Sequence, residues 1–281
     1  MKTEKATFTG ADGQQLAAEL DLPPGPPRAV ALFAHCFSCG KDLKSARRLT
    51  TRLTDRGFAV MRFDFTGLGS SEGDFADTNF SSNVADLLAA ADWLRQTYSA
   101  PSLLIGHSLG GAAVIAAAAH IPELTAVATV GAPADPGHVA HLFSCALDEI
   151  EENGHADVSI AGRTFTVKKQ FLDDIAGIQL DEALAALDIP LLVMHAPEDT
   201  IVSIDNAQKI FGAALHPKSF VALDGADHLM SEPAQAEYAA EVLATWADRY
   251  VPTHLAASDD VIVSASEGEV VVAERGTGKF A

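Results

Sequence analysis

The sequence predicts an α/β fold in which a mostly parallel sheet of eight strands carries helices on both faces. Three observations lead to this prediction. Short apolar runs bounded by loops recur along the chain, amphipathic segments of helical length separate most of them, and glycine or proline marks many of the joints. Parallel strands require long crossover connections, and a strand buried on both faces is apolar throughout. A chain of 281 residues, 48% of them hydrophobic, is long enough to enclose such a core.

The strands and helices follow one another in a regular order. Residues 7–20 indicate two strands around the hairpin signal GADG at 10–13, and a proline-rich loop closes that unit. The apolar run 29–34 then begins the alternation expected of a parallel sheet. Later strands are predicted at 58–63, 102–106, 127–130, 190–195 and 220–223, and helices at 43–56, 82–98, 109–120, 204–215 and 235–249.

One stretch, residues 135–187, interrupts the alternation. In place of the expected strand-and-helix unit, it contains an amphipathic helix, a hairpin and a second helix. We expect these elements to form a small cap over the carboxyl ends of the strands. The alternative is an insertion on the surface without a role at the site. The α/β core then comprises 1–134 and 188–251, and a tail of two further strands covers 252–281. Within the insertion the predicted helices are 139–151 and 171–187 and the hairpin strands 158–160 and 163–168; the tail strands are 261–264 and 269–273.

Charge and composition limit the classes of partner. The formal net charge is −19 and no stretch is rich in lysine and arginine, which disfavours nucleic acid and anionic membranes. No apolar run approaches the roughly 18 residues of a membrane span, and the first residues lack the apolar segment of a signal peptide. The chain has three cysteines, which are too few for a disulfide framework. This small number fits a reducing compartment. We therefore expect a cytoplasmic protein.

The most specific motif is GHSLG at 106–110, which matches the G-x-S-x-G nucleophile elbow. The serine of such an elbow, here Ser108, sits on a very tight strand-to-helix turn, so the residues two before and two after it have no room for a side chain. The context fits, because an apolar strand precedes the motif and a helix rich in small residues follows it. That helix N-terminus would stabilise negative charge developing near Ser108. The alternative is an ordinary glycine-rich turn.

A serine hydroxyl is a weak nucleophile and needs a base that a third group orients. In folds with this elbow, the acid and the histidine follow the serine in that order. Asp199 follows the strand 190–195 and is the predicted acid, with Glu198 as its rival and a turn or cap role as the alternative. His228 follows the last strand at the same edge of the sheet. The predicted catalytic triad is therefore Ser108, Asp199 and His228.

An oxyanion hole requires two backbone N–H groups. We expect Leu109, the residue after the serine, to supply one and Phe37, in the loop after the strand 29–34, to supply the other. The remaining polar residues near strand ends are expected to have structural roles, shaping loops by hydrogen bonding; they are His35, His107, His195 and Asp64.

Together these motifs resemble the α/β-hydrolase superfamily over residues 7–250. A narrower resemblance, carried by HCFSCGKDL at 35–43 and FDFTGLG at 63–69, is to hydrolase domains fused ahead of an OsmC-type peroxide-reducing domain. It implies that 252–281 is the start of such a domain, cut short, and that an OsmC-type domain is a partner in a longer natural chain. The insertion is similar to the cap of bacterial cinnamoyl and feruloyl esterases. The segments that carry the superfamily resemblance are HCF at 35–37, RFDFTGLGSS at 62–71, GHSLG at 106–110, the Asp199 loop and GADH at 225–228.

Cys36 departs from the superfamily pattern, which usually has glycine after the histidine. It forms a C-x-x-C spacing with Cys39. One interpretation is a redox-sensitive pair that gates the oxyanion loop; the alternative is two small residues filling a tight loop. No second cysteine pair or histidine cluster supports zinc.

These features predict a carboxylic ester hydrolase that acts through an acyl-enzyme on small to medium esters and needs no metal or cofactor. Phe143, Phe171 and Ile175 of the insertion are candidate substrate-binding residues; the alternative is that they form the insertion's own core. The same triad also fits an acyltransferase, a peptidase or a perhydrolase. A non-catalytic docking module for an OsmC-type partner is the other alternative. The tail is a candidate for pairing two chains into a homodimer.

Overall fold

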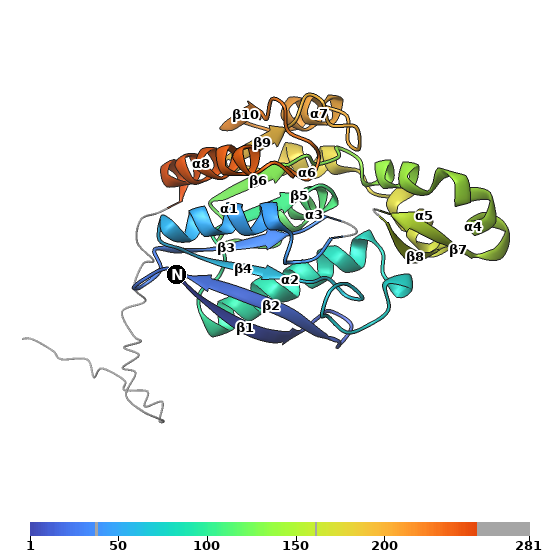
Figure 1. Ribbon diagram of the computed structural model, residues 1–281, viewed down its shortest axis with the longest axis horizontal. Helices are drawn as coiled ribbons and strands as arrows, with labels where there is room; N and C mark the ends of the chain where they lie inside the picture. Colours follow the sequence, from blue (N-terminus) through green and yellow to red (C-terminus); the bar gives the residue numbers. More distant parts are fainter. Residues whose placement is uncertain (37–38, 161, 252–281) are drawn as a thin grey trace, which may run out of the picture.

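Eight strands form one twisted sheet through the centre of the structure (Figure 1). This computed structural model describes residues 1–36, 39–160 and 162–251. The strand order is β1-β2-β4-β3-β5-β6-β9-β10, which confirms the predicted eight-stranded α/β sheet. The strands are β1 (Lys2–Thr9), β2 (Gln15–Leu22), β3 (Ala29–Ala34), β4 (Phe58–Phe63), β5 (Leu103–His107), β6 (Ala126–Val130), β9 (Leu191–His195) and β10 (Lys218–Ala222).

The sheet is parallel except at one edge. β1 pairs antiparallel with β2, and β2 pairs antiparallel with β4, whereas the other neighbours run parallel. Every residue of β3, β4, β5, β6 and β9 is buried, as expected of strands covered on both faces. The opening hairpin runs from Lys2 to Leu22 and is longer than the sequence predicted, because β2 pairs with β1 along its whole length.

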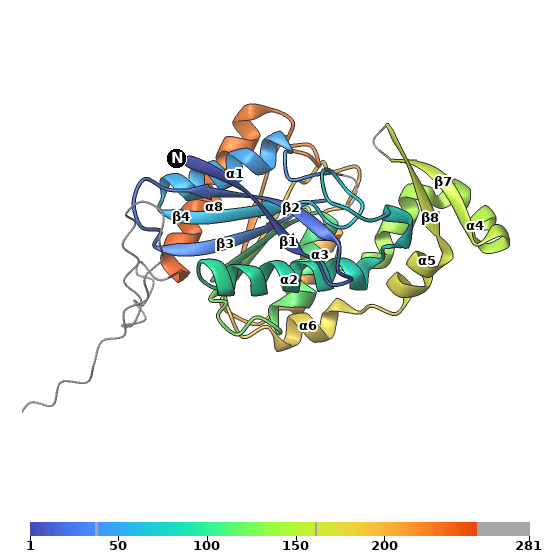
Figure 2. The same cartoon turned by 90° about the horizontal axis from the view of Figure 1, so that it is seen from below.

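Helices cover both faces of the sheet. Figure 2 shows α1 and α8 on one side and α2, α3 and α6 on the other. Each face has its own apolar core: α1 packs with α8 over one, and α2, α3, α6 and α7 pack over the other. The helices outside the insertion are α1 (Lys44–Asp55), α2 (Phe80–Thr97), α3 (Leu109–Ala118), α7 (Asp205–Ala213) and α8 (Pro233–Tyr250), with a short 3₁₀ turn η1 (Phe75–Asp77).

The insertion contains the predicted hairpin between helical segments, and it projects to one side of the sheet (Figure 1). Its apolar residues are continuous with the core beneath α2 and α3. The hairpin ring of Phe165, for example, lies 4.8 Å from that of Phe75 in η1. In order, its elements are η2 (Pro136–Ala146), α4 (Leu147–Asn153), β7 (His155–Ile160), β8 (Arg163–Lys168), α5 (Lys169–Ala176) and α6 (Leu180–Ala186).

Two predictions for the insertion were wrong in detail. The single helix expected at 171–187 is two helices, α5 and α6, and the chain leaves the helix at Gly177 because α5 packs against α2 whereas α6 packs against α3. The helix expected at 139–151 is divided at Phe143, whose φ of −129° and ψ of 28° lie outside the helical region. This irregular backbone accompanies complete burial of the Phe143 ring.

The strands predicted at 261–264 and 269–273 lie outside the described residues. Among the helices of the described part, none is long and apolar enough to cross a membrane.

Candidate active site

The turn between β5 and α3 carries Ser108. Its backbone has φ 55° and ψ −128°, a conformation that residues other than glycine rarely adopt. A Cβ on Gly106 would lie 2.2 Å from the carbonyl oxygen of Gly110. A Cβ on Gly110 would in turn lie 2.5 Å from the carbonyl oxygens of Ala34 and His35. Both glycines of the motif are therefore required by close backbone approach, as predicted for an elbow.

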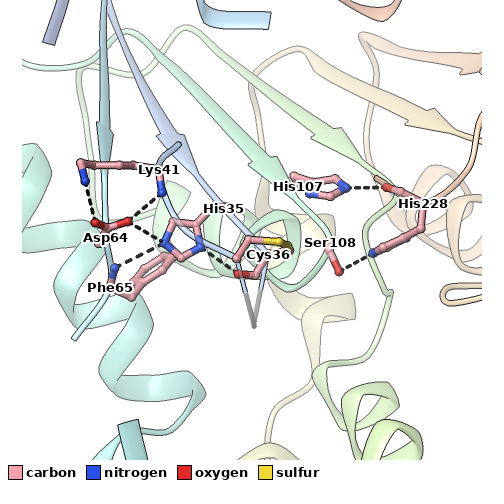
Figure 3. Close-up of a disulfide and its surroundings, with 9 residues drawn as sticks. His35, Cys36, Lys41, Asp64, Phe65, His107, Ser108 and His228 are labelled. Atoms are coloured by element: carbon pink, nitrogen blue, oxygen red, sulfur yellow. Dashed lines mark hydrogen bonds and ion pairs between the residues drawn. A yellow bond between two sulfur atoms is a disulfide. The ribbon is translucent and has the colours of Figure 1, made fainter. Parts of the chain in front are cut away.

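Three loops at the carboxyl edge of the sheet bring the predicted triad residues together. The Ser108 hydroxyl donates to Nε2 of His228 at 3.0 Å, the contact drawn in Figure 3. On the other side of the ring, Nδ1–H of His228 donates to Oδ2 of Asp199 at 2.7 Å. Glu198, the rival acid, instead accepts from the backbone N–H of Gly225 at 3.3 Å. The arrangement is a continuous hydrogen-bond chain of the type that activates a serine hydroxyl.

Asp199 is held as an ionised carboxylate. Its side chain is 1% exposed, and its second oxygen accepts the backbone N–H groups of Ile201 at 2.8 Å and Val202 at 2.9 Å. Burial alone would raise the pKa of Asp199, but the hydrogen bonds from His228 and from these two backbone groups outweigh it and lower the pKa. The carboxylate is thus charged at neutral pH and oriented toward the imidazole.

Gly131, directly after β6, is a site residue that the sequence analysis missed. Its φ is 56°, and a Cβ there would lie 3.4 Å from Nδ1 of His228 and 3.5 Å from Oδ2 of Asp199. A side chain at this position would crowd the hydrogen bond between imidazole and carboxylate. The available signal was a glycine immediately after a buried strand, where close approach of another group is common.

Two further histidines shape the loops of the site, which confirms their predicted role. Nε2–H of His107 donates to the carbonyl oxygen of His228 at 2.8 Å (Figure 3), and Nε2–H of His195 donates to that of Val202 at 2.8 Å. Burial, reinforced by the nearby His228, lowers the pKa of His107 to about 3, and burial also lowers the pKa of His195. Both rings are therefore neutral donors at ordinary pH.

Of the two predicted oxyanion donors, Leu109 lies in the described part of the chain and Phe37 does not. Leu109 is the first residue of α3, where backbone N–H groups have no acceptor within the helix. That position leaves its N–H available beside Ser108. Phe37, the other predicted donor, lies outside the described residues.

The loop after β3 is fixed at its far end by buried charges. The backbone N–H of Lys41 donates to Oδ1 of Asp64 at 2.7 Å, and the Lys41 ammonium donates to Oδ2 at 2.8 Å (Figure 3). Ser70 N–H also donates to Asp64, at 3.0 Å. These backbone bonds confirm that Asp64 has a structural role, and the sequence analysis missed its ion pair. The Arg62 guanidinium donates to the Lys41 carbonyl at 2.5 Å.

A small pocket opens beside Ser108, between the elbow and the insertion. His138 of η2 ties the two together, because its ring donates from Nε2 to the carbonyl oxygen of Ile201 at 2.8 Å. Ile201 is also a backbone donor to Asp199, so the insertion contacts the loop of the acid directly. The pocket is lined by Ser108, Leu109, Pro133, His138, Val139, Leu142, Ile201 and Val202.

The insertion residues proposed to bind substrate are deeply buried. Phe143, Phe171 and Ile175 are 0%, 2% and 3% exposed, and the two phenylalanine rings lie 6.1 Å apart, edge to face. None of them is among the residues that line the pocket beside Ser108. Their placement favours the alternative interpretation, in which they form the core of the insertion, and their contact with substrate stays a prediction.

Cys36 and Cys39 are joined by a disulfide, drawn in Figure 3. The link between the two sulfurs agrees with the interpretation of Cys36 and Cys39 as a pair, and a redox role for that pair stays a prediction. Cys145, in the insertion, is an exposed free cysteine.

A solved structure of close sequence decides the family. The esterase domain of a Rhodothermus marinus protein is 48% identical, with a TM-score of 0.74 over 89% of this chain and 100% of that chain. The chain belongs to the α/β-hydrolase family. It is accordingly an enzyme of the serine hydrolase class. The family model described as serine aminopeptidase, S33, matches residues 25–152.

More distant relatives are lipases and esterases. Human monoglyceride lipase is 27% identical over 252 residues, covering 79% of this chain and 82% of its own length. Est1E from Butyrivibrio proteoclasticus, solved with ferulic acid bound, is 20% identical and has a TM-score of 0.73 over 88% of this chain and 99% of that chain. At that identity Est1E shares the fold alone. The predicted superfamily is thus confirmed, and hydrolase activity is supported.

Proposed function

We propose that this protein hydrolyses carboxylic esters through an acyl-enzyme on Ser108. The observation that carries the proposal is the hydrogen-bond chain from Asp199 through His228 to Ser108 at the nucleophile elbow. In such a chain the imidazole acts as general base toward the serine and the carboxylate holds the imidazole in the tautomer that can accept the proton.

The chemistry follows from this geometry. Ser108 Oγ attacks the ester carbonyl while His228 takes its proton, and the N–H groups of Leu109 and Phe37 donate hydrogen bonds to the developing oxyanion. His228 then returns the proton to the departing alcohol, which leaves an ester on Ser108. Water, activated by the same imidazole, releases the carboxylic acid and restores the hydroxyl.

The walls of the site favour small to medium esters. Apart from Ser108 and His138, the residues that line the pocket are apolar, and they come from the elbow, the acid loop and the insertion. A pocket of this composition binds acyl or alkyl groups by excluding water. We infer that residues 135–187 act as a cap on the core formed by 1–134 and 188–251. The hydrogen bond from His138 to the Ile201 carbonyl holds one end of the cap against the core.

The test is labelling with a fluorophosphonate probe together with a panel of nitrophenyl and hydroxycinnamoyl esters. We expect wild type to label and to hydrolyse the shorter esters, and Ser108→Ala to do neither while keeping the wild-type unfolding transition. A Ser203→Ala variant, altered in the loop after β9 at an exposed serine whose hydroxyl accepts from the backbone N–H of Asp205, is the matched control and should retain both. Equal ester turnover by Ser108→Ala and wild type would refute the proposal.

The same experiment separates the alternatives on this triad. Aminoacyl nitroanilides test peptidase action, which the matched family description makes the first competitor. Added alcohol or hydrogen peroxide as acyl acceptor tests acyl transfer and perhydrolysis by product analysis. Absence of labelling in the folded wild type would favour a docking module. The OsmC-type partner and the homodimer stay predictions, because the tail 252–281 on which they rest lies outside the described part. The cytoplasmic location also stays a prediction.

A further inference from the structure

One peptide group, between Ile201 and Val202, faces the carboxylate of Asp199. Its N–H, which belongs to Val202, donates to Oδ1 of Asp199 at 2.9 Å, and the N–H of Ile201 donates to the same oxygen at 2.8 Å. The other oxygen, Oδ2, accepts from His228 at 2.7 Å. The position of this peptide group therefore determines how the carboxylate is presented to the imidazole.

The carbonyl of the same peptide group is bound by the insertion. Nε2–H of His138, in η2, donates to the Ile201 carbonyl oxygen at 2.8 Å. Because a carbonyl oxygen only accepts, Nε2 carries a proton, as it does in one neutral tautomer and in the imidazolium ion. A donor on the carbonyl polarises the peptide group and strengthens the hydrogen bond that its N–H makes. His138 is thus connected to Asp199 through one peptide group.

A second histidine holds the same segment from the core. Nε2–H of His195, at the end of β9, donates to the carbonyl oxygen of Val202 at 2.8 Å, and His195 is completely buried. The carbonyls of Ile201 and Val202 are therefore bound from two sides, one by the insertion and one by the sheet. His195 belongs to the core wherever the insertion lies, whereas the bond from His138 exists only when the insertion is docked.

The first turn of the insertion holds His138 in place. The Asp135 carbonyl, which opens η2, accepts the backbone N–H of His138 at 3.0 Å. Just before it, the N–H of Ala134 donates to Oδ1 of Asn206 at 3.1 Å, which ties the chain to the start of α7. One turn further on, the ring of His141 lies 5.3 Å from that of His138, edge to face. The His138 ring is therefore presented to the acid loop from a fixed backbone.

We propose that His138 is a positioning residue for the ester hydrolysis. Docked against the core, it holds the peptide group between Ile201 and Val202, and through it the Asp199 carboxylate, in line with His228. The inference rests on the proposed function. It gives the insertion a part in the chemical step, in addition to its role as a cap, without any contact between His138 and the reacting atoms.

The expected effect is on kcat. The imidazole becomes charged during the reaction, and an aligned carboxylate stabilises that charge, so poorer alignment lowers kcat and leaves ground-state binding nearly unchanged. For His138→Phe, which keeps a ring and removes the donor, we expect kcat to fall by about 3- to 10-fold, the rate equivalent of roughly one hydrogen bond. KM should change by less than about twofold. The loss is limited because Asp199 keeps its bonds from Ile201 and His228.

The experiment measures kcat and KM of the full chain on nitrophenyl butyrate, with active sites counted by fluorophosphonate labelling. His138→Gln is the rescue variant, because its side-chain amide places an N–H near the position of Nε2, and its kcat should lie within about twofold of wild type. His141→Phe is the matched control. His141 is exposed and is not among the residues that line the pocket beside Ser108, so the same substitution there should leave kcat unchanged.

A second control separates positioning from attachment of the insertion in general. Asp174 of α5 accepts the backbone N–H of Ser81 at 2.9 Å and its hydroxyl at 2.6 Å, which ties the insertion to the start of α2. Asp174→Ala loosens this attachment and leaves the bond between His138 and Ile201 in place. We expect its kcat to stay within about twofold of wild type. An equal loss of kcat in Asp174→Ala and His138→Phe would overturn the proposal.

Three further results would also overturn it: unchanged kcat in His138→Phe, equal loss in His138→Gln and His138→Phe, or a rise in KM alone, which would make His138 a pocket wall. Urea unfolding checks that each variant is folded. If His138→Phe is not, His138→Ala removes the donor without adding an apolar ring and replaces it in the same comparison. If wild type is labelled but hydrolyses no ester, the proposed function fails, and the labelling rate of the same variants tests His138 by itself.

Discussion

At the scale of single residues, the site depends on backbone conformations that cost energy in isolation. The φ of 55° at Ser108 belongs to a class of strained conformations that typically cost about 1–3 kcal/mol. The surroundings impose it, because Gly106 and Gly110 leave no space for the chain to relax. This conformation directs the hydroxyl at His228, and under the proposed function it would reduce the reorganisation needed during the reaction.

Asp199 provides the sharpest test at this scale. We predict that Asp199→Asn lowers kcat by about 10⁴-fold, the loss known for the same change in another serine triad, because an amide can stabilise the wrong imidazole tautomer. KM should change little. The measurement is steady-state hydrolysis of nitrophenyl butyrate near neutral pH, where the lowered pKa of Asp199 keeps the wild-type carboxylate ionised.

The matched control is the neighbouring carboxyl. Glu198 is exposed and its carboxylate accepts from the backbone N–H of Gly225, not from His228, so Glu198→Gln should retain kcat within about threefold. If Glu198→Gln lost as much activity as Asp199→Asn, the acid would have been assigned to the wrong residue.

At the scale of elements, a buried ionic cluster connects the loop after β3 to strands β2 and β4. Arg62 of β4 binds Asp21 at 3.0 Å and Glu19 at 3.0 Å, both on β2, and also the carbonyl of Lys41. Lys41 in turn pairs with Asp64, which is 1% exposed. A buried ion pair adds little net stability. Removing one partner, however, leaves the other charge buried without compensation, which is strongly destabilising. The cluster therefore specifies where the loop lies.

We predict that Asp64→Asn lowers the free energy of unfolding at pH 7 by about 3 kcal/mol, since the Lys41 ammonium is left buried without its carboxylate. Burial alone would raise the pKa of Asp64, but hydrogen bonds from Lys41 and Ser70 outweigh it and lower the pKa below the usual 3.8. A depressed folded-state pKa means that this stability is present above the unfolded value and is lost as pH falls through the folded value.

The difference between wild type and Asp64→Asn, measured by urea unfolding, should therefore be constant from neutral pH to about pH 5 and should shrink below about pH 4. Asp42→Asn serves as control. Asp42 also lies 3.4 Å from the Lys41 ammonium, but its side chain is 58% exposed, so its loss should cost less than about 0.5 kcal/mol. A wild-type-minus-Asp64→Asn difference that grew on acidification would contradict the ionised pair.

At the scale of the whole molecule, the net charge of −19 makes the average potential around the protein negative. Such a field slows the approach of anionic ligands, and salt screens it. We predict that kcat/KM for an ester bearing a free carboxylate, such as mono-nitrophenyl succinate, rises several-fold when the Debye length is reduced from about 30 Å at ~0.01 M to about 8 Å at ~0.15 M salt.

Nitrophenyl butyrate, which is neutral and of similar size, is the comparison substrate, and its kcat/KM should change less than twofold over the same range. Parallel salt dependence of the two esters would show that the protein's charge does not influence substrate approach.

The order of strands and helices could be predicted from the chain because each element carries its own local pattern. A parallel strand covered on both faces is an uninterrupted apolar run, and the elbow glycines are required by contacts within one turn. These signals located β3 to β6, β9 and Ser108 to within a few residues. Where the pattern depended on packing partners it failed, as at Gly177, where one amphipathic stretch serves two different neighbours, α2 and α3.

Local residue order was thus enough to predict the fold class, which the structure confirms, and to propose the nucleophile and the order of the triad along the chain. The positions that depend on segments far apart in sequence needed the folded molecule: Gly131 against the imidazole, Asp64 against Lys41, and the burial of Phe143 and Phe171. The physical reason is that hydrogen bonds, ion pairs and burial act between neighbours in space. A one-dimensional pattern records which groups a residue carries, and only the tertiary contacts determine which groups it meets.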